Sequence, residues 1–172
     1  SFCLIILING SNFIDGLNGL CLGYYLLIIY FILEINFNFS LFYGDENLII
    51  FVSSLCVILF YNFLSKIFIG DNGSYIIAVL LGIILIQFYN ENNSISSFYI
   101  VLLLWYPCFE LLFSMLRKYR LKISVIEPDN DHLHHLIFYF FMKKYNLNNL
   151  TANNLTSLII LAFNFILFNI AS

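Results

Sequence analysis

The sequence predicts an all-α membrane protein, a bundle of helices that crosses the bilayer several times. Hydrophobic residues make up 62% of the 172 residues, charged residues only 10%, and the mean hydropathy is +0.92. A soluble domain has roughly 45–50% apolar and about 25% charged residues. The apolar residues form continuous runs without the alternation of a barrel strand, so helices are expected to cross the membrane.

Five apolar runs are close to the length that a membrane-spanning helix needs. Residues 2–8 are expected to be the end of a preceding span, which makes residues 1–172 the carboxy-terminal part of a single integral-membrane domain. Residues 136–145 are shorter and end in two lysines, which is typical of a helix at the membrane surface. The five expected spans are 17–33, 48–64, 75–89, 97–116 and 155–170.

A polar segment, residues 9–20 (NGSNFIDGLNGL), lies directly between apolar runs. Asn9, Asn12, Asp15 and Asn18 recur every third residue, so on a helical turn they would lie roughly along one side. The glycines between them let backbone come close to a ligand. Asn, Asp and Gly are also the ordinary residues of loops. The segment alone therefore fits both a polar site at a membrane edge and a plain turn.

A second polar motif, FIGDNGS at residues 68–74, places Asp71 just before the expected span 75–89. Taken alone it is typical of a tight turn with Asp as a helix cap. Asp15 and Asp71 are, however, the only acids in their two short loops. Mg²⁺ is usually held by one or two carboxylates, with water and phosphate completing its shell, so the pair is a candidate metal site.

The third motif is PDNDHLHH, residues 128–135, which contains all three histidines of the chain. One interpretation is a zinc site, since His132 and His135 would share a helical face. The other is phosphate binding by imidazole N–H donors, helped by the basic residues just upstream. No thiol lies near and basic residues are many, so the anion interpretation is favoured.

Pairs of expected spans separate the three motifs, so all three are expected on the same side of the membrane. The basic residues lie on that side and the opposite loops carry only acids, so the positive-inside rule places the motifs in the cytoplasm. The basic residues are Lys66, Arg117, Lys118, Arg120, Lys122, Lys143 and Lys144, and the opposite acids are Glu34, Asp45, Glu46 and Glu91.

In this order and spacing, the three motifs resemble the signature loops of the polyprenyl-phosphate N-acetylhexosamine-1-phosphate transferase family. The resemblance implies transfer of an N-acetylhexosamine-1-phosphate from a UDP-sugar to a polyprenyl phosphate, usually undecaprenyl phosphate, with release of UMP. It implies Mg²⁺, with Mn²⁺ as an alternative, and a multi-pass enzyme of the bacterial inner membrane whose active site faces the cytoplasm. No nucleic-acid partner is expected, and a homodimer is left open.

The form PDNDHLHH resembles the branch that starts O-antigen, enterobacterial-common-antigen or teichoic-acid synthesis with UDP-N-acetylglucosamine. It is less similar to the peptidoglycan branch, which uses UDP-N-acetylmuramoyl-pentapeptide and carries three adjacent histidines. The family's aspartate pair from an earlier cytoplasmic loop has no counterpart in residues 1–172. This segment alone is therefore not expected to be active.

The resemblance also assigns roles position by position. Asp71 matches the Mg²⁺-binding aspartate, and Asn12 and Asp15 match polar groups close to the metal and the diphosphate. Whether the lipid phosphate attacks directly or Asp15 first forms a covalent intermediate is left open. The UDP-sugar positions are Phe68, which would stack on uracil, Asn18, which would read its edge, and Gly70, and the phosphate-contacting histidines are His132, His134 and His135.

Two residues inside the run 97–116 carry separate expectations. Glu110 is an acid within an apolar run, and such residues usually face protein or a water-filled cavity. We expect it to face the interior and pair with a polar neighbour. Pro107 is expected to kink the helix. The alternative from another class is a transporter with Asp15, Glu110 and Asp71 along an ion path, although that class distributes polar groups through the membrane depth.

Overall fold

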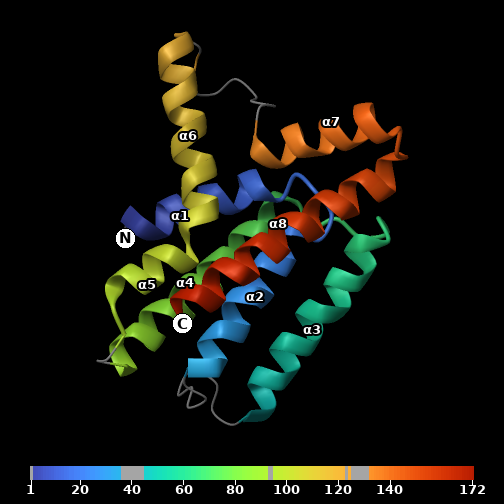
Figure 1. The fold of residues 1–172 in the computed structure, drawn as a ribbon. Helices are drawn as coiled ribbons and strands as arrows, with labels where there is room; N and C mark the ends of the chain where they lie inside the picture. Colours follow the sequence, from blue (N-terminus) through green and yellow to red (C-terminus); the bar gives the residue numbers. More distant parts are fainter. Residues whose placement is uncertain (1, 36–44, 93–94, 123, 125–131) are drawn as a thin grey trace.

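The computed structural model describes the chain except for residues 1, 36–44, 93–94, 123 and 125–131. The described part is helical and contains no strand, which confirms the predicted all-α class (Figure 1). Its helices are α1 (Phe2–Ile14), α2 (Leu20–Ile35), α3 (Asp45–Phe63), α4 (Gly70–Glu91), α5 (Ser97–Leu103), α6 (Trp105–Leu121), α7 (Leu133–Tyr145) and α8 (Asn149–Ala171).

By length and composition, α4 and α8 can each cross a membrane, and the bent pair of α5 and α6 would make a third span. The apolar segments Cys3–Ile14, Leu20–Ile35 and Ile49–Phe63 are shorter. The five runs expected from the sequence correspond to α2, α3, α4, the α5–α6 pair and α8. The chain is an integral membrane protein, with two or three full-length spans among the described residues.

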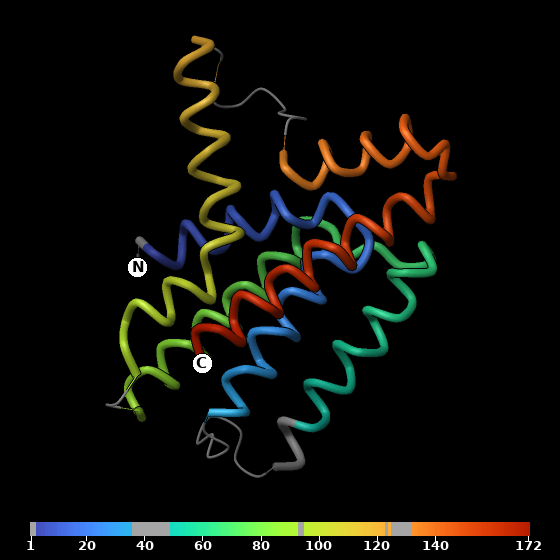
Figure 2. Tube along the Cα trace, viewed as in Figure 1, coloured from blue at the N-terminus to red at the C-terminus, as the bar shows by residue number. Residues whose placement is uncertain are grey.

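Helix α2 forms the centre of the bundle. Most of its residues are buried, and the buried ones face all directions around the helix. A helix that is apolar all round is expected where other helices surround it. It contacts α8 and α3 most extensively, while α1 packs between α4 and α6 (Figure 2). The end of α1, the start of α2, the end of α3 and the start of α4 therefore meet at one end of the bundle.

The chain bends by 69° between α5 and α6, which confirms the predicted kink and places it at Leu104. Pro107 has no N–H to donate to the carbonyl of Leu103, four residues earlier, and its ring would clash with that carbonyl in a straight helix. The Tyr24 hydroxyl of α2 donates to the freed Leu103 carbonyl oxygen at 2.9 Å. The carbonyl group that Pro107 leaves without a helical partner thus accepts a hydrogen bond from the central helix.

The bend directs α6 across α1. Gly10 lies at this crossing, where a Cβ atom would come within 2.4 Å of the Pro107 carbonyl oxygen. Only glycine allows the two backbones to approach this closely. One turn after the crossing, Glu110 lies on α6 and is buried. The Gly10 contact therefore sets where that carboxylate meets the end of α1.

Helix α1 continues to Ile14, so half of the polar segment 9–20 is helical. Asn9 and Asn12 lie on its last turns, whereas Asp15 begins a turn that ends at Gly19. The prediction of four polar side chains along one helical side therefore holds only for the first two. The helix over 136–145 is observed as α7, which begins slightly earlier, at Leu133.

Candidate active site

The turn after α1 is fixed to two other helices by hydrogen bonds. The Asn18 N–H donates to Asn153 Oδ1 at 2.7 Å, which links the turn to the start of α8. The Asn18 side-chain amide donates to Ser65 Oγ at 2.5 Å. The Gly19 N–H donates to Asn62 Oδ1, at the end of α3, also at 2.5 Å. The backbone around Asp15 is thus held from both sides.

Asn62 also connects this turn to the segment that leads into α4. Its side-chain amide donates to the Ile67 carbonyl oxygen at 2.7 Å, and only 3% of the residue is exposed. Asn154 of α8 donates to the Phe63 carbonyl oxygen at 3.0 Å and holds the end of α3 in place. One buried side chain therefore sets the position of the Asp15 turn relative to the start of α4, where Asp71 lies.

Asp15 and Asp71 are close enough for their charges to interact. Asp15 is half-buried and Asp71 is exposed in the first turn of α4. Burial, and next the negative charge of Asp71, raise the pKa of Asp15 to about 7. Asn12 lies one turn before Asp15, and the Asp15 N–H donates to the Asn12 carbonyl oxygen at 3.3 Å. A cation between the two carboxylates would relieve this repulsion.

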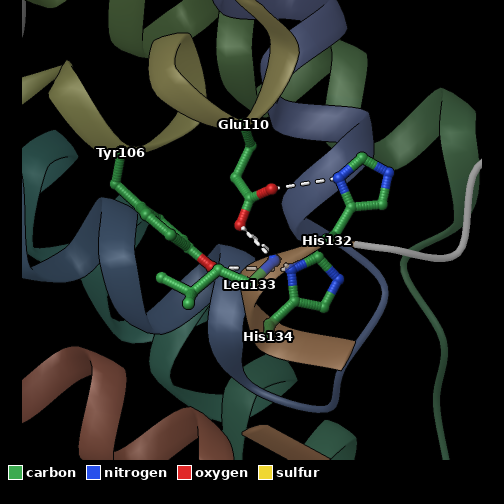
Figure 3. Close-up of polar contacts among 5 residues, drawn as sticks. All are labelled: Tyr106, Glu110, His132, Leu133 and His134. Carbon is green, nitrogen blue, oxygen red and sulfur yellow. Dashed lines mark hydrogen bonds and ion pairs between the residues drawn. The ribbon is translucent and has the colours of Figure 1, made fainter. Parts of the chain in front are cut away.

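The histidine motif meets α6 at Glu110, which is only 2% exposed (Figure 3). His132 Nδ1 lies 3.0 Å from Glu110 Oε2, and the Leu133 N–H donates to Glu110 Oε1 at 3.1 Å. His134 Nδ1 lies 3.7 Å from Oε1 and 3.5 Å from the Tyr106 hydroxyl. The expected interior position of Glu110 is confirmed, and its polar partners are histidines.

The same histidines contact the Asp15 turn. A Cβ atom on Gly16 would lie 2.7 Å from His134 Nε2 and 3.2 Å from His135 Nε2, so glycine is required for this contact. His134 is fully buried, and burial lowers its pKa against the opposing effect of the Glu110 carboxylate. Burial therefore favours the neutral form of its ring. The three motifs, far apart in the sequence, meet at one place.

The zinc alternative finds no support among the described residues. His132 has extended backbone angles and precedes the first turn of α7, so it does not share a helical face with His135. Among the described residues, no three side chains of the His, Cys, Asp or Glu type form a cluster that could hold a metal ion. Structural zinc takes four protein ligands and catalytic zinc takes three. Residues 128–131 of the motif lie outside the described part.

The remaining predicted site residues lie near the start of α4 and in the Asp15 turn. Phe68 is 74% exposed just before α4, and Gly70 begins that helix with a φ of 65°. Asn18 is 7% exposed and its side-chain nitrogen is engaged by Ser65, which leaves the side-chain oxygen for other contacts. Sequence reasoning did not single out Asn62, because asparagine is common throughout this chain.

The profile of glycosyl transferase family 4 matches residues 1–89, just over half of the chain. The chain belongs to glycosyl transferase family 4. The match covers the Asp15 turn and the start of α4 with Asp71. No solved structure matches significantly.

Curated relatives of this family 4 chain come from several bacteria. A probable undecaprenyl-phosphate N-acetylglucosaminyl 1-phosphate transferase of Bacillus subtilis is 30% identical over 77% of the chain and 37% of the relative. An undecaprenyl-phosphate alpha-N-acetylglucosaminyl 1-phosphate transferase of Thermotoga maritima is 28% identical over 76% and 39%. A decaprenyl-phosphate N-acetylglucosaminephosphotransferase of Mycobacterium leprae is 29% identical over 75% and 38%. The chain thus spans under two-fifths of the length of these relatives.

Proposed function

We propose that this protein transfers N-acetylglucosamine-1-phosphate from UDP-N-acetylglucosamine to a polyprenyl phosphate, such as undecaprenyl phosphate, and releases UMP. An oxygen of the lipid phosphate forms a bond to the sugar-bearing phosphorus, and the bond between that phosphorus and UMP breaks. Membership of family 4 and the names of the relatives support this reaction. The observation that carries the proposal is the meeting of Asp15, Asp71 and the histidines around one turn.

The proposal includes Mg²⁺, with Mn²⁺ as an alternative. The arrangement fits such an ion, because the pKa of Asp15 is raised partly by the charge of Asp71 and a divalent cation favours ionisation of both. Two carboxylates are also what Mg²⁺ commonly takes from protein. Asp71 and Asn12 would hold the ion with Asp15 beside it. When bound, Mg²⁺ would neutralise charge on the diphosphate and favour departure of UMP.

The side chains around the metal residues would hold the donor. His134 and His135 lie against the Asp15 turn, where their ring nitrogens can contact the phosphates of the UDP-sugar. Phe68 is exposed beside the start of α4, as a ring that stacks on uracil would have to be. We place this site on the cytoplasmic face of the bacterial inner membrane, since the basic residues gather on that side.

The test is UMP release by the purified full-length protein, supplied with undecaprenyl phosphate, Mg²⁺ and a panel of UDP-N-acetylhexosamines. The proposal expects release that requires lipid and metal together and is fastest with UDP-N-acetylglucosamine. Asp71→Asn should abolish turnover. Glu91→Gln, which changes a carboxylate at the other end of the same helix, should keep it. Absence of release with every donor, or full activity of Asp71→Asn, would overturn the assignment.

A further inference from the structure

Glu110 is a buried carboxylate that the proposed reaction does not use directly. It lies on α6 with 2% of its surface exposed. Both of its oxygens already face protein groups, Oε2 toward His132 and Oε1 toward the Leu133 N–H. Burying a carboxylate is costly unless it is paired and hydrogen-bonded. The position therefore calls for a role that depends on these two contacts.

The contact with the Leu133 N–H fixes the beginning of α7. His132 is the N-cap residue of this helix, and its side chain makes no capping hydrogen bond. The N–H of Leu133, the first helical residue, cannot bond within its own helix. It donates instead to Glu110 Oε1, on another helix, at 3.1 Å. A carboxylate at a helix N-terminus also interacts favourably with the helix dipole. Glu110 thus replaces the missing cap and attaches α7 to α6.

The contact with His132 fixes the histidine rings. A carboxylate only accepts hydrogen bonds, so the proton of this contact must lie on His132 Nδ1, 3.0 Å away. Nε2 is then the ring nitrogen left for other contacts. His134 Nδ1 likewise faces Oε1, at 3.7 Å, and the Tyr106 hydroxyl (Figure 3). Its Nε2 is buried without a hydrogen-bond partner among the described residues and faces Gly16. Glu110 therefore sets which nitrogen faces the Asp15 turn.

We propose that Glu110 is a positioning residue that holds α7 and the rings of His132 and His134 in place, His132 against Phe13 at the end of α1 and His134 against the Asp15 turn, beside the UDP-sugar site. The inference rests on the proposed function for its kinetic consequences and on the contacts alone for its structural ones. Glutamine cannot replace glutamate in this role. Two N–H donors converge on two carboxylate oxygens, whereas a glutamine side chain offers one oxygen acceptor and one N–H₂ donor.

The structural arm of the test measures the histidine tautomers by ¹⁵N NMR in the full-length protein, without substrate. In the wild type, His132 should carry its proton on Nδ1. In Glu110→Gln the proton should move to Nε2, or the Leu133 amide signal should shift as its bond is lost. Glu34→Gln, an exposed glutamate on α2, is the matched control and should leave both signals unchanged. A wild-type His132 protonated on Nε2 overturns the proposal without any variant.

The kinetic arm measures UMP release with each substrate varied in turn. Loss of a group that orients a metal-ligating histidine typically costs about 10–100-fold, and by analogy Glu110→Gln should lose activity in that range. The loss should fall on kcat and on KM for the UDP-sugar, with KM for the polyprenyl phosphate unchanged. In a His132→Ala background, Glu110→Gln should add little further loss, because the two residues act as one unit.

The two arms separate failure of this proposal from failure of the proposed function. If the wild type releases no UMP, the enzymatic assignment fails while the tautomer measurement still decides the role of Glu110. If the wild type is active and Glu110→Gln has wild-type kinetics and spectra, the positioning role is refuted. Fully additive losses in the double variant refute it as well. If Glu110→Gln does not fold, the wild-type spectrum and Glu110→Asp, which keeps both acceptor oxygens, still decide the role.

Discussion

Replacing Gly16 with alanine tests whether the histidines are seated against the Asp15 turn. The added Cβ atom would lie 2.7 Å from His134 Nε2 and 3.2 Å from His135 Nε2, both closer than ordinary contact. His134 is fully buried and its ring contacts Glu110, so it has little room to retreat. Overpacking of this kind costs about 1–3 kcal/mol. If that strain displaces the histidines, donor kcat/KM should fall roughly five- to 150-fold.

The assay is UMP release with UDP-N-acetylglucosamine varied, combined with a thermal unfolding measurement. The matched control is Gly23→Ala, whose Cβ atom would lie 2.6 Å from Leu161 Cδ1, the end of a flexible side chain on α8. That variant should lose some stability without a selective loss of donor use. Wild-type donor kinetics in Gly16→Ala would refute the contact between the turn and the histidines. Equal losses in both variants would show that only general stability is affected.

Further variants probe the Asp15–Asp71 interaction and the bend between α5 and α6. In metal-free protein, Asp71→Asn should lower the pKa of Asp15 from about 7, as measured by ¹³C NMR of its carboxyl group. An unchanged pKa would show that the charge of Asp71 does not act on Asp15. Because that raised pKa makes the folded state bind more protons, stability should decline as pH rises from 3.8 to about 7, and Asp15→Asn should abolish this decline. Tyr24→Phe should cost about 1–3 kcal/mol of unfolding free energy by leaving the Leu103 carbonyl unpaired. The cost should shrink when Pro107→Ala supplies a new N–H, as a double-mutant cycle can measure.

The candidate site was predictable where short motifs carried the chemistry. Asp15, Asp71 and the three histidines stand out because charged and ionisable residues are rare in so apolar a chain. Counting spans between the motifs then predicted that they would lie on the same side of the membrane. The asparagines that hold the turn could not be found this way, since Asn62 and Asn153 resemble many other asparagines in the sequence until their partners are known.

Glu110 shows the limit of sequence reasoning most clearly. An acid in an apolar run predicts burial and a polar partner, and both were found. The partner's identity was not predictable, because the bend at Leu104 and the crossing of Gly10 with Pro107 decide where α6 passes. The sequence predicted only a polar partner, and the structure identifies His132 and His134.

Hydropathy and residue chemistry are local properties, so the amino-acid sequence was enough to predict the all-α membrane class, the approximate helices and the candidate residues for metal and phosphate. Which nitrogen of His134 faces the Asp15 turn, and how that turn is held, became clear only from the folded arrangement. Those features depend on groups more than 20 residues apart, Glu110 with His132 and the Gly19 N–H with Asn62. Their distances are set by helix crossings, which no local pattern in the chain encodes.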